Sequence, residues 1–149
     1  MTLENLLAIR QLQAHTADPA AIRKLLEAAR RNLADARVDS ISTDNRFDAA
    51  YKCVMQCAML GLWAKGYRTS TSQPGHHQTA IQCLGHTMGV EWDDIIVLDA
   101  LRRKRNLSDY EGDPVSETTL AEAMAQAVKL LTHTETWLRA NRPDAMGDA

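Results

Sequence analysis

Aromatic residues are scarce in this sequence, where Phe, Trp and Tyr together make up 5% of 149 residues. Strands draw on aromatic and β-branched side chains, whereas Ala and unbranched side chains lose little conformational entropy in a helix. Ala, Leu and Met are abundant in the chain. The composition therefore favours an all-α protein, and the length is enough for one domain with a hydrophobic core.

Long hydrophobic runs are also missing, since no apolar stretch approaches the roughly 20 residues that span a bilayer. The start "MTLENLLAIRQLQ" has no basic region followed by an uninterrupted apolar stretch, which argues against a signal peptide. The three cysteines are an odd number and fit a reducing compartment better than a disulfide scaffold. These features predict a cytoplasmic protein with no membrane partner.

Neither sign of charge dominates, because the net charge is −2. Binding to nucleic acid would therefore have to come from a local basic patch. The sequence contains no phosphate-cradling Gly-rich loop of the Walker kind and no Gly-x-Ser-x-Gly elbow. We expect no cofactor.

Capping residues divide the chain into helical segments without a Gly/Ser linker between them. Asp18 is an N-cap followed by Pro19 at the first helical position, Gly66 is a left-handed C-cap, and Ser116 is another N-cap. Apolar residues recur at helical spacing between these signals. The predicted helices cover about residues 3–14, 19–36, 44–65, 77–88, 92–108 and 116–141.

These segments predict one helical domain at residues 1–141 and a frayed tail at residues 142–149. The four long helices make the core, so the expected fold is an all-α, up-and-down four-helix bundle with one or two additional short helices.

The segment "LRRKRNLSDYEG" combines a run of four cations with side chains that can hydrogen-bond. On a helix, Leu98, Leu101 and Arg105 lie at i, i+3 and i+7, so Arg105 continues an apolar seam. An arginine there is costly unless a carboxylate, a phosphate or a partner chain neutralises it. The alternative is an arginine whose stem covers the bundle end while its charge reaches water. Arg103 and Lys104 point elsewhere, and we expect them to be solvated.

The same segment resembles the late helix of the HEPN superfamily (higher eukaryotes and prokaryotes nucleotide-binding), especially its bacterial stand-alone members. "RFDAAYKCVMQCAMLGLWAKGYR" is similar to the long HEPN helix that carries an Ala-Tyr pair and ends in Gly-Tyr-Arg. "GHHQTAIQCLGHTMG" is similar to the Gly-His-His segment and short helix that follow. The resemblance covers about residues 44–131, in family order.

The resemblance implies an up-and-down four-helix bundle that pairs into a homodimer. It also implies a metal-independent ribonuclease site across the dimer cleft, built from Arg, four to six intervening residues and then His. Carried onto this chain, Arg105 matches the arginine and Asn106 the polar residue that often follows it, whereas Tyr110 stands at the histidine position. Tyrosine, with an ordinary pKa of about 10, is a poor general base at neutral pH. It can still hydrogen-bond a phosphate or stack on a base.

Other side chains could complete such a cleft. His76 and His77 sit in a loop from which one could supply the missing base, or they could cap the next helix or pack on Tyr67. Asp48 lies near the start of its helix and either favours the helix dipole or orients Arg105 across the bundle.

The cysteines are candidate metal ligands as well. Cys53 and Cys57 share a helix face at i and i+4, and with Cys83 or a histidine they could imitate a zinc site. That face also bears apolar residues and there is no Cys-x-x-Cys pair, so buried thiols are the better interpretation and we expect no metal site.

The sequence therefore predicts a HEPN-like protein that binds RNA or a nucleotide through a basic cleft, with weak or no ribonuclease activity. The resemblance implies a toxin–antitoxin, defence or stress module, with an antitoxin or another protein as partner. One alternative is an active metal-independent ribonuclease in which Arg105 and Tyr110 work with a loop histidine. Another is a structural dimerisation or adaptor module whose arginine only locks helix packing. The predicted binding residues are Arg102, Arg105, Asn106, Asp109, Tyr110, Asp48, His76 and His77, of which Arg105 and Tyr110 are the catalytic candidates.

Overall fold

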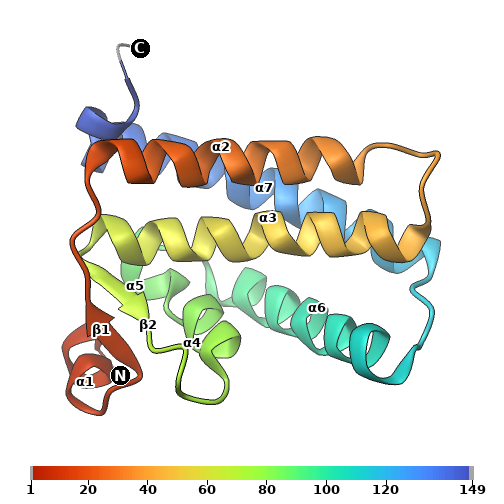
Figure 1. Ribbon diagram of the computed structural model, residues 1–149, viewed down its shortest axis with the longest axis horizontal. Coiled ribbons are helices and arrows are strands. Elements are labelled where there is room, and N and C mark those ends of the chain that lie inside the picture. The colour runs from red at the N-terminus through yellow and green to blue at the C-terminus, as the bar shows by residue number, and fades with distance from the viewer. Residues whose placement is uncertain (1, 148–149) are drawn as a thin grey trace.

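The computed structural model describes residues 2–147 and is mostly helical, with one small antiparallel sheet (Figure 1). The helices and strands, in chain order, are α1 (Leu3–Ala8), β1 (Leu12–Ala14), α2 (Pro19–Ala36), α3 (Thr43–Ala64), β2 (Tyr67–Thr69), α4 (His76–Gln82), α5 (Leu84–Met88), α6 (Trp92–Glu111) and α7 (Glu117–Asn141), followed by the 3-10 turn η1 (Pro143–Ala145).

Helix α3 lies at the centre of the molecule. Helix α2 runs along one side of it, α7 packs behind, and α4, α5 and α6 lie on the other side (Figure 1). Side chains from several faces of α3 are buried, including Phe47, Val54, Cys57 and Leu60. A helix that is apolar around most of its circumference is one surrounded by other elements. Gly61 belongs to this packing, because a Cβ there would lie 2.7 Å from Thr87 Oγ1 on α5.

The capping signals in the sequence set the ends of the long helices. Asp18 Oδ1 accepts a 2.7 Å hydrogen bond from the backbone N–H of Ala21, and Ser116 Oγ accepts one from Thr119. These bonds satisfy amide groups that have no partner inside the helix. Gly66, just past the end of α3, has a φ of +92°, a conformation that glycine adopts without steric cost. The predicted starts of α2 and α7 and the glycine stop of α3 are confirmed.

The N-terminal prediction is wrong in its second half. The expected helix over residues 3–14 ends at Ala8, and Arg10 turns the chain with a φ of +64°. Strand β1 follows and pairs antiparallel with β2, with Leu12 opposite Thr69. Leu12 is 1% exposed, so this pairing buries a side chain that the short helix would carry past the core. A contact with residues more than 50 positions away overrides the local helical pattern.

Three further boundaries differ from the predicted ones. The helix expected at 77–88 is divided at Cys83 into α4 and α5, and α6 continues past Ser108 to Glu111. The prediction of a frayed tail is wrong at residues 143–145, which form η1 and bury Ala145. Arg142 holds this turn by hydrogen bonds to the Asp144 carboxylate. Residues 148–149 of the predicted tail lie outside the described residues.

Helices long and apolar enough to cross a membrane are not found among residues 2–147.

Candidate functional site

Arg105 extends a buried seam on α6, as the spacing of its residues predicts. Leu98 and Leu101 are each 1% exposed, and the side chain of Arg105, one turn further on, is 25% exposed. The side chain of Arg103 is 64% exposed, and Lys104 is exposed as well. The predicted division of the run into inward and solvated cations is confirmed.

Three carboxylates surround the two inward arginines. Asp109 Oδ2 lies 2.8 Å from Arg105 Nε, and Asp48 Oδ1 lies 4.0 Å from the same nitrogen. Arg105 Nε is buried but makes no aligned hydrogen bond in the described part of the chain, so its contact with Asp109 is an ion pair only. Arg102 Nε donates a 2.8 Å hydrogen bond to Asp99 Oδ1. Both arginines are thus held through Nε, and within residues 2–147 neither uses a terminal Nη nitrogen in a hydrogen bond.

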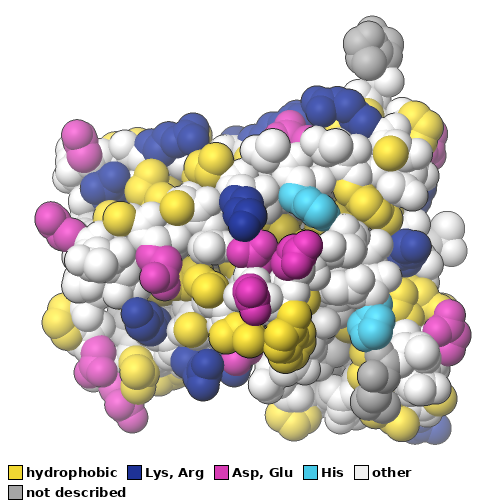
Figure 2. All heavy atoms as spheres, turned by 180° about the vertical axis from the view of Figure 1, so that it is seen from behind, with side chains coloured by type: hydrophobic (Ala, Val, Ile, Leu, Met, Phe, Trp, Pro, Cys, Tyr) yellow, Lys and Arg dark blue, Asp and Glu magenta, His cyan; other side chains and the backbone are white. Residues whose placement is uncertain are grey.

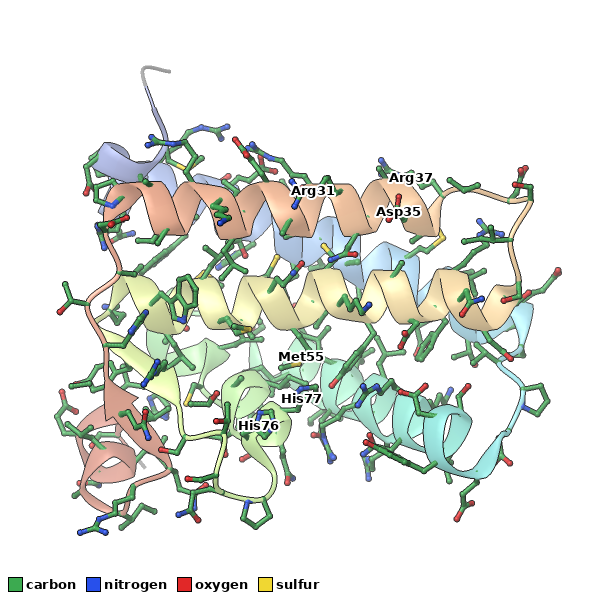
Figure 3. The ribbon with its side chains drawn as sticks, viewed as in Figure 1. Arg31, Asp35, Arg37, Met55, His76 and His77 are labelled. Carbon is green, nitrogen blue, oxygen red and sulfur yellow. The ribbon has the colours of Figure 1, made fainter. Side chains whose placement is uncertain are left out.

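A hollow of about 340 Å³ opens between α4 and the second half of α6. Figure 3 shows His76 and His77 on α4, on the same side of the molecule as the centre of α6. We call this hollow the Arg105 groove, and its lining residues are Gly75, His76, His77, Gln78, Arg102, Arg105, Asn106 and Tyr110. Six of the eight predicted binding residues therefore line one groove. The sequence predicts a loop at these two histidines. In the structure they are instead the first two residues of α4.

The other two predicted binding residues, Asp48 and Asp109, do not line the groove. They contact Arg105 Nε from outside the lining. Tyr110 lies at the rim with 78% of its surface exposed. An aromatic side chain so exposed is free to stack on a ligand.

Tyr51 supports the groove from below and was not among the predicted site residues. Its hydroxyl lies 3.1 Å from His77 Nδ1, and the guanidinium carbon of Arg105 lies 5.5 Å from the centre of its ring. The second distance is within the range of a cation–π contact. Burial raises the pKa of Tyr51 to about 12, against the opposing effect of Arg105 and Arg102. In the sequence Tyr51 recurs at helical spacing with apolar residues such as Phe47 and Val54, and only the fold brings its hydroxyl to His77.

His77 is held as a neutral imidazole. Burial lowers its pKa to about 4, and the neighbouring charges of His76, Arg105 and Arg102 act in the same direction. Tyr51 keeps its proton, and His77 Nδ1 is the hydrogen-bond partner that the structure gives its hydroxyl. We therefore assign Tyr51 as the donor to Nδ1, which places the imidazole proton on Nε2. That N–H is left to donate to a ligand.

The groove consequently offers donors and few acceptors. The Nη nitrogens of two arginines, the Nε2–H of His77 and the side-chain amide of Asn106 meet in one hollow. Charge-assisted hydrogen bonds from arginine suit phosphate and carboxylate oxygens, and two such cations near one hollow favour an anion. Asp48, Asp99 and Asp109 offset much of the charge, so the groove is not a broad basic surface.

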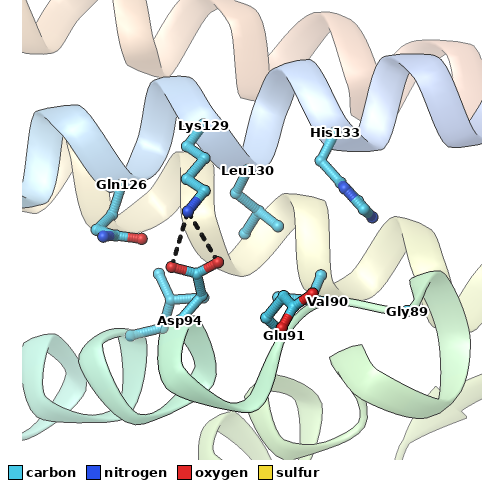
Figure 4. A pocket seen from close by; sticks show the side chains of 9 residues that line it. Gly89, Val90, Glu91, Asp94, Gln126, Lys129, Leu130 and His133 are labelled. Carbon is cyan, nitrogen blue, oxygen red and sulfur yellow. Dashed lines mark hydrogen bonds and ion pairs between the residues drawn. The ribbon is translucent and has the colours of Figure 1, made fainter.

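A different hollow, of about 250 Å³, lies between α6 and α7 (Figure 4). We call it the α6–α7 hollow. Leu98 and Leu130 form an apolar floor, and Lys129 reaches across to Asp94, with its Nζ 3.0 Å and 2.9 Å from the two carboxylate oxygens. Lys129 and Asp94 thus neutralise each other, and none of the predicted site residues lines this hollow.

The cysteines are buried thiols. Cys53, Cys57 and Cys83 are free and 0–1% exposed. A hydrogen bond with Cys53, together with burial, raises the pKa of the Cys57 thiol. Burial raises the pKa of Cys83 to about 11. Such thiols are poor metal ligands, because the thiolate is the ligand form. Within the described residues no three His, Cys, Asp or Glu side chains are grouped so as to hold a metal ion.

Comparison of the chain with protein-family models, with curated proteins and with solved structures finds no match in any of the three. The HEPN resemblance therefore stays a prediction, and the functional argument depends on the geometry of the Arg105 groove.

Proposed function

We propose that the protein binds RNA or a nucleotide by its phosphate in the Arg105 groove. The observation that carries this proposal is the convergence of Arg102 and Arg105 on one hollow with their terminal Nη nitrogens uncommitted within residues 2–147. His76, His77 and Asn106 add hydrogen-bonding groups, and Tyr110 adds an aromatic ring at the rim. The binding is local, because Asp48, Asp99 and Asp109 offset much of the charge of Arg102 and Arg105. The opposite face of the molecule, seen in Figure 2, mixes basic, acidic and hydrophobic side chains without a continuous basic area.

The test compares two arginines of the same run. Arg105→Ala and Arg103→Ala remove the same charge, but only Arg105 lines the groove. We expect Arg105→Ala to weaken binding of a labelled single-stranded RNA by roughly ten- to a hundredfold, the effect of losing a charged hydrogen bond. Arg103→Ala should change the affinity less than about twofold. The affinity of wild-type protein should fall steeply with salt, since phosphate contacts release counterions.

An equal loss in both arginine variants, or RNA binding that ignores salt, would contradict the proposal. A normal affinity in Arg105→Ala combined with a lower thermal stability or a dissociated dimer would instead favour the structural module. Circular dichroism of each variant establishes that it is folded before its affinity is interpreted.

A second candidate, metal-independent RNA cleavage, is favoured by the histidines that line the groove. The rings of His76 and His77 meet edge to face with their centres 4.7 Å apart, close to Arg105. Tyr51 engages Nδ1 of His77, whereas His76 makes no side-chain hydrogen bond in the described part of the chain, so its ring nitrogens are open to a ligand. Cutting of labelled transfer or messenger RNA in EDTA, lost in His76→Ala and Arg105→Ala but kept in Arg103→Ala, would establish this activity. An uncut RNA that still binds would exclude it.

We also propose the up-and-down four-helix bundle for the four long helices. The α2–α3 and α6–α7 connections lie at the same end of the molecule, and α3 contacts α2, α6 and α7 (Figure 1). Both features agree with consecutive long helices that run in opposite directions.

The proposed assembly is a homodimer that pairs through the outward face of α6. This face exposes Trp92, Ile96, Leu107 and Tyr110, at 63%, 48%, 45% and 78%. Its first turn carries the exposed Asp93 and its second half the exposed Arg103 and Lys104, so two copies placed antiparallel across a two-fold axis would match opposite charges. Sedimentation analysis should show a dimer that Ile96→Asp dissociates. A monomeric wild-type protein would refute the pairing.

The proposed compartment is the cytoplasm, which the free thiols of the described chain suit. A toxin–antitoxin, defence or stress setting, with an antitoxin or another protein partner, remains a proposal that follows from the HEPN resemblance.

A further inference from the structure

A second groove follows the boundary between α2 and α3. It consists of two adjoining hollows of about 350 Å³ and 510 Å³ that share Asn32, Asp35 and Lys52 in their linings. We call this depression the α2–α3 groove. Figure 3 shows Arg31 and Asp35 of α2 on the same face of the molecule as the histidines of α4. The two grooves are therefore open to one face.

Asp48 connects the α2–α3 groove to the Arg105 groove. Its side chain lines the first, and its Oδ1 lies 4.0 Å from the Nε of Arg105, which lines the second. A single ion pair is thus the boundary between them. A strand of two or more nucleotides that passes Asp48 would reach both grooves.

The α2–α3 groove is rich in side-chain amides. Asn32 Nδ2 donates a 2.8 Å hydrogen bond to Gln56 Oε1. This bond fixes the two amides relative to each other and leaves Asn32 Oδ1 as an acceptor and Gln56 Nε2 as a donor, with no hydrogen bond to either in the described part of the chain. Nucleobases carry neighbouring donors and acceptors on their edges. The amide side chains of Asn and Gln can hydrogen-bond to a donor and an acceptor on one base edge. Asn45 contributes another amide to the same lining.

Apolar surface and balanced charge complete the groove. Val38 and Ile41, in the connection between α2 and α3, are 44% and 42% exposed and line one end. Apolar side chains there suit the flat face of a base. Lys52 lines both hollows and Arg31 one of them, but Asp35 and Asp48 bring matching negative charges. With no net charge in its lining, the groove suits a base better than a phosphate.

We propose that the α2–α3 groove is a nucleobase subsite for single-stranded RNA whose neighbouring phosphate is bound in the Arg105 groove. This inference rests on the proposed phosphate binding and adds that the ligand is a strand of at least two nucleotides. The mononucleotide fills the Arg105 groove alone, whereas a strand also places a base between Asn32, Gln56 and the apolar end of the α2–α3 groove.

The experiment measures binding of adenosine 5′-monophosphate and of oligoadenylates of two, four and eight nucleotides to the full chain. In wild type we expect the oligoadenylates to bind about tenfold or more tighter than the mononucleotide, the effect of adding one well-placed base. Asn32→Leu and Lys52→Met should remove most of this gain while leaving mononucleotide affinity within about twofold. Lys52 is exposed, so the fold should tolerate Lys52→Met even if Asn32→Leu, at a half-buried position, impairs folding. Gln126→Leu, an amide in the lining of the α6–α7 hollow, is the control and should change neither affinity.

The outcomes separate this inference from the proposal that underlies it. Arg105-dependent binding of all four probes with equal affinity would refute the base subsite and leave phosphate binding intact. An Asn32→Leu variant that weakens the mononucleotide and the oligoadenylates equally would also refute it. Absence of Arg105-dependent binding to any probe would refute phosphate binding and the subsite together.

Discussion

The α6–α7 hollow and the Arg105 groove both border α6, but their cations are paired with carboxylates in different ways. In the α6–α7 hollow, Lys129 of one helix is paired with both carboxylate oxygens of Asp94 on the other. In the Arg105 groove, Asp109 and Asp48 approach Arg105 only at Nε. The first arrangement links two helices and uses up the cation. The second holds the cation at Nε and leaves its terminal nitrogens without a hydrogen bond within residues 2–147, as the proposed phosphate binding requires.

The largest effect should come from the floor of the α6–α7 hollow. Leu98→Ala removes a side chain that is 1% exposed, and we expect it to lower the free energy of unfolding by about 2–5 kcal/mol. Urea titration measures this loss. Val128→Ala, on α7 and 38% exposed, should cost about 0.5 kcal/mol or less. Similar costs at the two positions would mean that the hollow is not a packed part of the core.

Tyr51→Phe should have the next largest effect, about 1–2 kcal/mol of stability, because it leaves Nδ1 of the half-buried His77 without its donor. Nitrogen NMR of the imidazole should then show loss of the tautomer with the proton on Nε2. Tyr110→Phe, at a hydroxyl on the exposed rim, should leave both measurements unchanged. An unaltered tautomer in Tyr51→Phe would show that the hydroxyl does not set it.

The stability of the protein should depend on pH through His77. Its pKa is about 4 in the folded chain against an ordinary value of 6.5, so between these values the unfolded chain binds more protons. The free energy of unfolding should therefore fall as the pH falls from 6.5 toward 4. We expect about 1 kcal/mol from this group after allowing for the solvent screening of a half-exposed ring. His77→Gln should flatten the dependence and His86→Gln should not. Parallel curves for wild type and His77→Gln would disprove the assignment.

The smallest effect should come from the ion pair of the α6–α7 hollow. The Lys129 side chain is 65% exposed, and exposed pairs contribute about 0.2–1 kcal/mol. Lys129→Met should lower stability by no more than that and should not alter RNA affinity. A large loss of RNA binding in this variant would contradict the assignment of Lys129 to helix packing and of Arg105 to RNA binding.

Local signals in the sequence predicted much of the fold. Asp18 with Pro19, Gly66 and Ser116 mark helix ends because each acts on backbone groups within a few residues of itself. The inward position of Arg105 also follows from local spacing, since the seam is a property of one helix. The β1–β2 pairing and the division of α4 from α5 were missed because they depend on packing between distant segments.

The sequence by itself determined that the chain is mostly helical, where its long helices begin, and that Arg105 continues the buried seam of α6. Only the tertiary structure decided that His76 and His77 join Arg105 in one groove and that the Tyr51 hydroxyl lies 3.1 Å from His77 Nδ1. It also decided that Asp48 lies between this groove and the one along α2. The physical reason is range: helix periodicity and caps act over a few residues, whereas these side chains belong to α3, α4 and α6 and meet only when the helices pack.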